Sequence, residues 1–237
     1  MRSWVLAVVA VLAVVQGCPR EQRLTISAAA SLKDVLTKVV SASGIPATVN
    51  LGASGALQRQ IEQGAPVDVF LSAGSQQLDA LEQAGLVDGA RVPFAANALV
   101  LVVPTASSVT SADALKSMTR IAMAEPGSVP AGKHAEDALR LLGYSPGLIL
   151  AKDVRQVLNY VESGEVEAGL VYATDARASS RVRGVATLKT SAPIGYAGVV
   201  IKGSRHPEDA RRFLEFLRSA PAARLLASHG FLPAAVP

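Results

Sequence analysis

Short apolar stretches alternate with amphipathic segments along most of this chain. Buried strands are predicted where the apolar run is continuous, at 23–28, 49–51, 67–72, 98–103, 120–124, 168–172 and 194–201. Helices are predicted where apolar residues recur every three or four positions, at 32–40, 54–62, 76–83, 112–117, 131–142, 154–163, 208–219 and 222–228. Strands that alternate with helices of this length are typical of parallel sheets covered by helices. The pattern therefore predicts an α/β fold.

Two strongly apolar strands bracket the middle of the chain and suggest two lobes. The stretches 98–103 and 194–201 enclose a segment that has strand and helix units of its own. We expect lobe I to combine residues 22–96 with 196–237 and lobe II to span 97–195. Two segments, near residues 97 and 196, would then cross between the lobes and serve as a hinge.

Several predicted helices begin directly after a run of small residues. Ser31 and Ser54 have the position of helix N-caps, and Asp34 stands where a capping-box partner of Ser31 would be. Similar starts occur at 129–132 and 152–155. The free N–H groups of a helix start, together with the helix dipole, favour an anion. We expect these four helix starts to converge on one small oxyanion.

Composition narrows the classes of partner. Only 4% of the residues are aromatic while 50% are hydrophobic, so the core must consist mainly of Ala, Val and Leu. The net charge is +4, and the basic residues are densest near the C-terminus, at Arg205, Arg211, Arg212, Arg218 and Arg224. Several of them lie at helical spacing opposite apolar residues, which indicates a solvated helix face. Without interleaved aromatic residues, nucleic-acid binding is not expected.

The first 18 residues are typical of a signal peptide. Arg2 precedes an apolar run from Trp4 to Val15, which is too short to span a bilayer. The single cysteine, Cys18, follows Gly17, and this junction resembles the lipobox of bacterial lipoproteins, in which the cysteine carries the lipid. Ordinary signal-peptide cleavage with an incidental cysteine stays open. We expect a periplasmic or extracytoplasmic protein whose only link to the membrane would be a lipid on Cys18.

Enzymatic sites have weak support in the sequence. The three histidines do not lie at metal-ligand spacing, so a catalytic metal centre is not expected. The segment 52–56 is similar to a nucleophile elbow, but Ala56 stands where the motif needs glycine. A serine-dependent hydrolase that uses Ser54 remains the alternative from a different class.

The segment 127–134 matches a phosphate-binding loop up to its last position. A nucleotide hydrolase needs Ser or Thr after Lys133 to ligate magnesium, and this chain has His134 there. Pro130 also removes one N–H group from the loop. Nucleotide hydrolysis is therefore not expected, whereas delivery of an anion to a helix start remains consistent with the segment.

Six segments together resemble the periplasmic molybdate-binding proteins of ABC transporters. They occur in the order and spacing of that family over essentially the whole mature chain, at 29–32, 53–55, 64–68, 129–132, 153–155 and 171–172. In that family two serine hydroxyls, two backbone N–H groups and a tyrosine hydroxyl hold the oxyanion. The resemblance places these roles on Ser31, Ser54, Ala131, Val154 and Tyr172.

The resemblance also implies a fold, a function and partners. The fold would be a type II periplasmic binding protein, with two lobes that each contain a mostly parallel sheet flanked by helices. The protein would capture molybdate or tungstate with high affinity by hinge closure and deliver it to the permease of an ABC importer driven by an ATPase. Molybdenum would be bound only as the oxyanion, without a cofactor. The protein would be a monomer and not an enzyme.

The chemistry of the five residues agrees with this function. A tetrahedral dianion offers only acceptors, so hydroxyls and N–H groups match it without lysine or arginine. Phosphate near neutral pH carries a proton that would need an acceptor, and leaving it unpaired costs about 1–3 kcal/mol. Sulfate has shorter bonds and would not reach all donors at once. Binding of another small anion, such as sulfate or thiosulfate, is the alternative within the same class.

Overall fold

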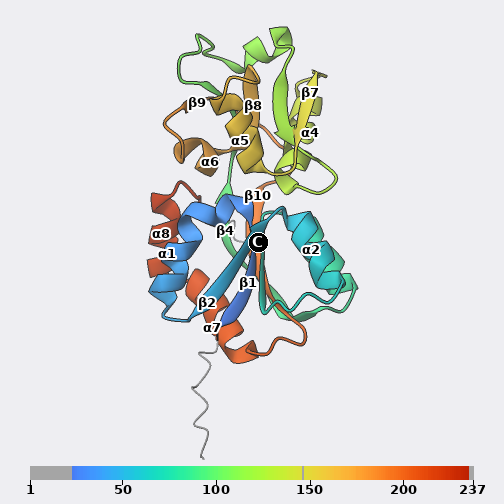
Figure 1. Cartoon of the computed structure of the whole chain (residues 1–237), viewed down its shortest axis with the longest axis vertical. Coiled ribbons are helices and arrows are strands. Elements are labelled where there is room, and N and C mark those ends of the chain that lie inside the picture. Colours follow the sequence, from blue (N-terminus) through green and yellow to red (C-terminus); the bar gives the residue numbers. More distant parts are fainter. Residues whose placement is uncertain (1–22, 146, 235–237) are drawn as a thin grey trace, which may run out of the picture.

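Two lobes, each built on a five-stranded sheet, make up the protein (Figure 1). The structure is a computed structural model that describes residues 23–145 and 147–234. The expected signal peptide and Cys18 lie outside the described residues. The two-lobed α/β architecture predicted from the sequence is confirmed.

The sheet of lobe I has the strand order β2-β1-β3-β10-β4. Its strands are β1 (Leu24–Ala29), β2 (Ala47–Gly52), β3 (Val69–Ser72), β4 (Val87–Asn97) and β10 (Ile194–Ile201). The first three strands pair in parallel, and β10 is antiparallel to both of its neighbours. The helices of this lobe are a 3₁₀ turn, η1 (Ala30–Leu32), and α1 (Lys33–Ser43), α2 (Ser54–Glu62), α3 (Ser75–Gln83), α7 (Pro207–Leu217) and α8 (Ala220–Ser228).

The sheet of lobe II repeats this plan with the order β7-β6-β8-β5-β9. Its strands are β5 (Leu99–Pro104), β6 (Ile121–Ala124), β7 (Leu148–Ala151), β8 (Ala168–Tyr172) and β9 (Val182–Leu188). Again three strands are parallel, and β5 runs antiparallel to both of its neighbours. Its helices are η2 (Ala112–Ser117), α4 (Pro130–Leu141), α5 (Val154–Glu162) and α6 (Ala173–Arg177). Both sheets are therefore mixed, with parallel and antiparallel pairs in equal number.

Apolar periodicity explains how the helices dock on the sheets. In α5 the buried residues are Val154, Val157, Leu158 and Val161, one stripe of the helix that faces the sheet of lobe II. Burying a side chain of this size stabilises the fold by about 1.5–3 kcal/mol. On one face of the lobe I sheet, a separate apolar cluster under α2 and α3 includes Phe70.

The two crossings between the lobes are short. β4 continues into β5 through Ala98 alone, and the chain returns through the loop 189–193. β10 begins at Ile194, which pairs with Asn97, so both crossings lie side by side at the edge of the first sheet. The final helices pack on lobe I, where Leu232 forms a bridge to Ala96.

The helix ends follow the sequence at some positions and not at others. Gly44 and Gly64 end α1 and α2 with φ of 68° and 87°, as expected for glycine after a helix. Asp153 caps α5 by accepting from the Gln156 N–H at 2.9 Å. The predicted cap of Ser31 is wrong, because it lies inside the 3₁₀ turn and α1 begins two residues later.

The predicted cap of Ser54 is also wrong. Ser54 is the first residue of α2, Ala53 has the N-cap position, and no side-chain cap bond forms. The hydroxyls of both serines have other partners, which are described below.

One buried carboxylate stands out in lobe II. Asp175 in α6 is fully buried and forms an ion pair with Arg155 Nε at 3.4 Å. Burial raises the pKa of Asp175 to about 7, against the lowering effect of Arg155, and the charges of Asp34 and Asp153 raise it further. Arg155 also pairs with Asp34 of lobe I. The ionised Asp175 is therefore an internal charge that weakens the fold.

Replacing Asp175 with asparagine should make the protein more stable at and above pH 7. The folded protein holds a proton on Asp175 up to about pH 7, whereas the unfolded chain releases it near its ordinary value, so wild-type stability falls as pH rises from about 4 to 7. We expect Asp175→Asn to raise Tm by several degrees at pH 8 and by less at pH 4.5, measured by thermal unfolding.

Asp137 is a control whose contribution to stability changes with pH in the opposite direction. Its pKa is lowered to about 2, chiefly by the backbone N–H of Ser191 and then by the Ser191 hydroxyl. Its contribution to stability is present above its ordinary pKa and disappears as pH falls toward 2. Asp137→Asn should therefore lower Tm at neutral pH.

A Tm difference between Asp175→Asn and the wild type that does not change with pH would contradict the raised pKa of Asp175.

Candidate ligand-binding site

A small cavity lies between the two lobes. All five residues proposed from the sequence line it, and each is no more than 4% exposed: Ser31, Ser54, Ala131, Val154 and Tyr172. The space open to the centre of a water molecule is about 10 Å³, which is room for about one water. The structure therefore brings the predicted residues together around one small void.

The carboxyl ends of parallel strands place these residues. Ser31 and Ser54 come two residues after the ends of β1 and β2, and the starts of α4 and α5 follow β6 and β7. Tyr172 is the last residue of β8. In open α/β sheets, ligands bind in the crevice outside the carboxyl ends of the strands. Both lobes direct this edge toward the other, so the cavity receives groups from each sheet.

Two backbone N–H groups at the cavity have no partner within their helices. Val154 is the first residue of α5 and Ala131 the second of α4, positions where an α-helix provides no acceptor for the N–H. The dipoles of these helices add positive potential at the same point. The lining contains no lysine, arginine or histidine, and its one carboxylate, Asp153, already accepts from the Gln156 N–H.

Two hydroxyl groups of the site contact the backbone of Ala73. Ser54 Oγ accepts from the backbone N–H of Ala73 at 3.3 Å, and the Tyr172 hydroxyl lies 3.5 Å from the Ala73 carbonyl. Burial raises the pKa of the Tyr172 hydroxyl, and Tyr196 and Asp175 add to the rise. Tyr172 is therefore a neutral donor at physiological pH.

Sequence analysis did not identify three polar residues that lie behind Ser31. Ser31 Oγ is 2.9 Å from the Tyr196 hydroxyl, and Asn97 Nδ2 donates to Tyr196 at 3.3 Å and to Thr174 Oγ1 at 2.9 Å. All of these side chains are buried. A sequence signal exists only in retrospect, because Asn97 and Tyr196 are polar residues within apolar stretches at the two crossings.

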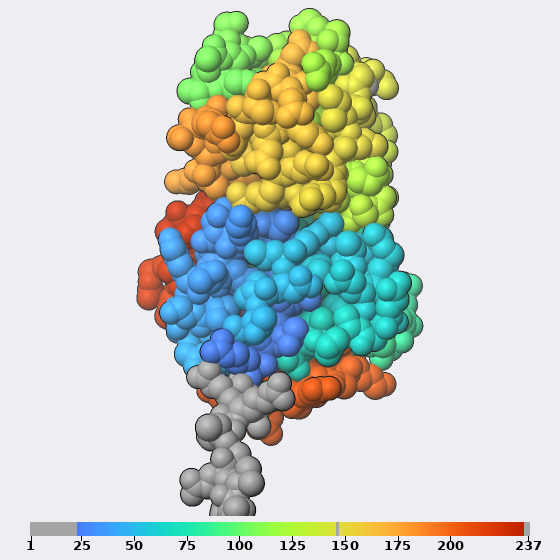
Figure 2. Space-filling model, in the orientation of Figure 1, coloured from blue at the N-terminus to red at the C-terminus, as the bar shows by residue number. Residues whose placement is uncertain are grey.

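Direct contacts across the lobes show that this is a closed conformation. The Gly55 N–H in lobe I donates to the Ser128 carbonyl in lobe II at 3.0 Å, and Arg155 pairs with Asp34. A Cβ at Gly55 would lie 2.4 Å from that carbonyl oxygen, so only glycine permits this approach. Figure 2 shows the two lobes in contact across the visible face.

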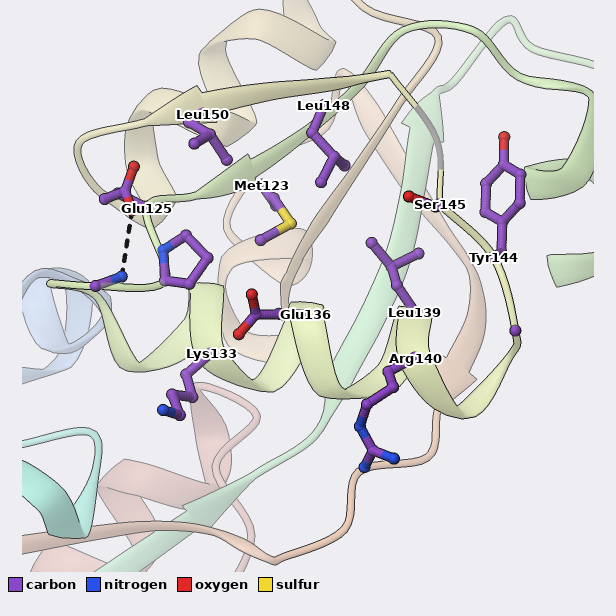
Figure 3. Close-up of a pocket in the computed structure, with 13 residues that line it drawn as sticks. Met123, Glu125, Lys133, Glu136, Leu139, Arg140, Tyr144, Ser145, Leu148 and Leu150 are labelled. Carbon is purple, nitrogen blue, oxygen red and sulfur yellow. Dashed lines mark hydrogen bonds between the residues drawn. The ribbon is translucent and has the colours of Figure 1, made fainter.

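A larger pocket opens on lobe II between α4 and β7, with a volume of about 880 Å³ (Figure 3). Apolar side chains such as Met123, Leu148 and Leu150 gather in it, whereas Lys133 and Arg140 extend away from them. It offers few donors that point to a common centre. It therefore fits a small polar ion less well than the cavity between the lobes.

Residues 23–145 and 147–234 offer no cluster of metal ligands and no membrane-crossing helix. That part of the chain contains no cluster of three or more His, Cys, Asp or Glu residues able to hold a metal ion. None of its helices has the length and apolar character needed to cross a bilayer.

Known proteins resemble this chain over most of its length. The bacterial protein "Putative ABC transporter substrate-binding lipoprotein YvgL" of Bacillus subtilis is 39% identical over 88% of this chain and 85% of its own. The "Molybdate-binding protein ModA" of Escherichia coli is 34% identical over 89% of each chain. A solved structure, the "substrate binding domain of putative molybdenum ABC transporter from Clostridium difficile", is 37% identical, with a TM-score of 0.72 over 90% of this chain and 99% of its own.

A family model agrees with these relatives. The model described as "Bacterial extracellular solute-binding protein" matches residues 24–232, which include both sheets and every residue of the cavity. The chain therefore belongs to the family of bacterial extracellular solute-binding proteins.

Proposed function

We propose that this protein binds molybdate or tungstate outside the cytoplasmic membrane and delivers it to an ABC importer. The observation that carries the proposal is the cavity between the lobes, where hydroxyls and N–H groups from both lobes converge without a cationic side chain. Relatives described as molybdate-binding proteins cover nearly the whole chain, which supports the same ligand.

The donors of the cavity match a fully deprotonated oxyanion. Hydrogen bonds to a charged group contribute about 1.5–3 kcal/mol each, and each helix start adds roughly 0.3–1 kcal/mol. The proposed donors are the hydroxyls of Ser31, Ser54 and Tyr172 and the N–H groups of Ala131 and Val154. Together these interactions offset the loss of the ion's hydration. A ligand with an O–H group would need one of the hydroxyls to accept from it, and that hydroxyl would then no longer donate to the ligand.

Ligand entry requires the lobes to separate. The five residues are almost completely buried, so an ion of several atoms cannot reach them in the closed form. The two short crossings, Ala98 and the loop 189–193, allow the lobes to rotate as rigid bodies. Binding would hold the lobes closed because each lobe supplies only part of the donor set.

The same proposal covers location and partners. The family is extracellular, and one relative is described as a lipoprotein, which supports an exported protein anchored, if at all, through Cys18. The closed form would dock as a monomer on a permease driven by an ATPase. The protein would carry out binding without catalysis, and no cofactor is required.

Isothermal titration against a panel of anions tests the ligand. We expect tight binding of molybdate and tungstate, with sulfate, thiosulfate and phosphate at least a hundred times weaker. Sulfate is too small to reach all donors, phosphate carries a proton, and thiosulfate has a sulfur, a weaker acceptor, in place of one oxygen. Preferential binding of sulfate or phosphate would contradict the proposal. Ester hydrolysis that Ser54→Ala abolishes would show a hydrolase instead.

Ser31→Ala should weaken molybdate binding by about 10- to 150-fold, because one charge-assisted hydrogen bond of about 1.5–3 kcal/mol is lost. Titration of both proteins measures the change. Ser163→Ala is the matched control, since its hydroxyl is exposed and contacts its own helix and Glu165. Unchanged affinity in Ser31→Ala, with a lowered Tm, would return Ser31 to a structural role.

Gly55→Ala tests closure. The added methyl group would collide with the Ser128 carbonyl of the other lobe, while alanine is favourable in the helix that contains it. We expect a retained or raised Tm, binding weakened by more than tenfold, and no contraction in small-angle scattering when molybdate is added.

Gly184→Ala is the control for the closure experiment, because a Cβ there meets open space and its φ is ordinary. It should bind and contract as the wild type does. If the wild type showed the same dimensions with and without molybdate, hinge closure would be wrong.

A further inference from the structure

We propose that Asn97 and Tyr196 fix the Ser31 hydroxyl as a hydrogen-bond donor to the ligand and thereby select for oxyanions that carry no proton. The inference rests on the proposed function and adds two positioning residues to it. Neither residue lines the cavity, so both would act through Ser31.

The amide of Asn97 has one possible orientation. The Ala98 backbone N–H donates to Asn97 Oδ1 at 2.9 Å, and an N–H group can only donate. The oxygen of the amide is therefore on that side. Its nitrogen faces the hydroxyls of Thr174 and Tyr196, at 2.9 Å and 3.3 Å, and donates to both.

The hydroxyl of Tyr196 then has only one acceptor for its hydrogen. Its oxygen receives the N–H of Asn97, and among the described residues its other hydrogen-bond partner is Ser31 Oγ at 2.9 Å. Tyr196 is completely buried, and burial raises its pKa, so the hydroxyl keeps its proton. A buried O–H group without a partner is unfavourable. Tyr196 must therefore donate to Ser31.

Ser31 is left with one hydrogen and no protein acceptor in the described chain other than the hydroxyl that already donates to it. Because Ser31 lines the cavity, its hydrogen is directed to the ligand. An oxyanion oxygen accepts it, whereas an O–H group of a protonated anion would meet another donor. The orientation exists before the ligand arrives, since Ser31, Tyr196 and Asn97 all belong to lobe I.

The hydroxyl of Ser54 also directs its hydrogen to the ligand, but through a different contact. Its oxygen accepts from the backbone N–H of Ala73, which no side-chain substitution can reverse. The direction of Ser31, in contrast, depends on the amide of Asn97. A single change of that amide to a carboxylate would reverse the chain of hydrogen bonds and make Ser31 an acceptor toward the cavity.

Asn97→Asp is the variant that reverses the chain while keeping every contact. Its first oxygen would still accept from the Ala98 N–H, and its second would accept from the hydroxyls of Thr174 and Tyr196. Tyr196 would then accept from Ser31, whose lone pairs would face the ligand. The added negative charge weakens the binding of all anions, so the affinity of this variant alone does not separate the two effects.

A double-mutant cycle separates the effect of the added charge from the effect of the reversed hydrogen bonds. Molybdate is titrated into the wild type, Ser31→Ala, Asn97→Asp and the double variant. We expect Ser31→Ala to weaken binding by about 10- to 150-fold in the wild type and by less than threefold in Asn97→Asp, because Ser31 no longer donates there. An equal loss in both backgrounds would overturn the inference. Failure of the wild type to bind molybdate would instead overturn the proposed function.

Tyr196→Phe provides a second measurement, which holds even if Asn97→Asp does not fold. Without the Tyr196 hydroxyl, Ser31 can turn and accept from a protonated anion. We expect the preference for molybdate over arsenate, whose dianion keeps one O–H group, to fall by at least fivefold in competition titrations. Tyr144→Phe is the matched control, because its hydroxyl donates to the Met118 carbonyl in lobe II, away from Ser31, and it should leave the preference unchanged. An unchanged preference in Tyr196→Phe would contradict the assignment.

Discussion

The loss of water from a doubly charged ion is the cost that the architecture of this protein has to offset. Hydrogen bonds replace that water only if several donors reach the ion together and no acceptor competes for them. A helix start provides such donors without a side-chain charge. Mixed sheets with parallel strands in each lobe bring two helix starts from one lobe and two from the other to the same point. The fold thus serves mainly to align these ends.

Small residues make this convergence possible. Gly55 lets a backbone N–H of one lobe reach a carbonyl of the other. Ala53 and Ala131 line the cavity with side chains of a single methyl group. Aromatic residues are scarce in the chain, yet Tyr196 contacts the rings of Phe94, Tyr172 and Phe231 at the junction of the lobes. Aromatic rings therefore gather at the junction of the lobes, and among them only Tyr172 also lines the cavity.

Local pattern predicted much of the fold and of the cavity, but not the contacts behind it. The continuous apolar runs of β8 and β10 have the predicted bounds, because buried strands need such runs. The sequence did not predict β4, because this partly exposed edge strand contains Asp88, Arg91 and Pro93. Ser31 lines the cavity, but the helix cap expected for it does not form. Its true partner, Tyr196, lies 165 residues away, a pairing that only tertiary packing creates.

The burial of the cavity residues has a kinetic consequence. An ion bound among such buried residues would leave slowly while the lobes touch, so its residence time would follow the waiting time for a spontaneous opening. A transporter that binds both lobes and moves them apart could then release the ion. It would not need to offer the ion a competing ligand group. Ligand release would then depend on bending at Ala98 and the loop 189–193, and Ala98 also holds the amide of Asn97 behind Ser31.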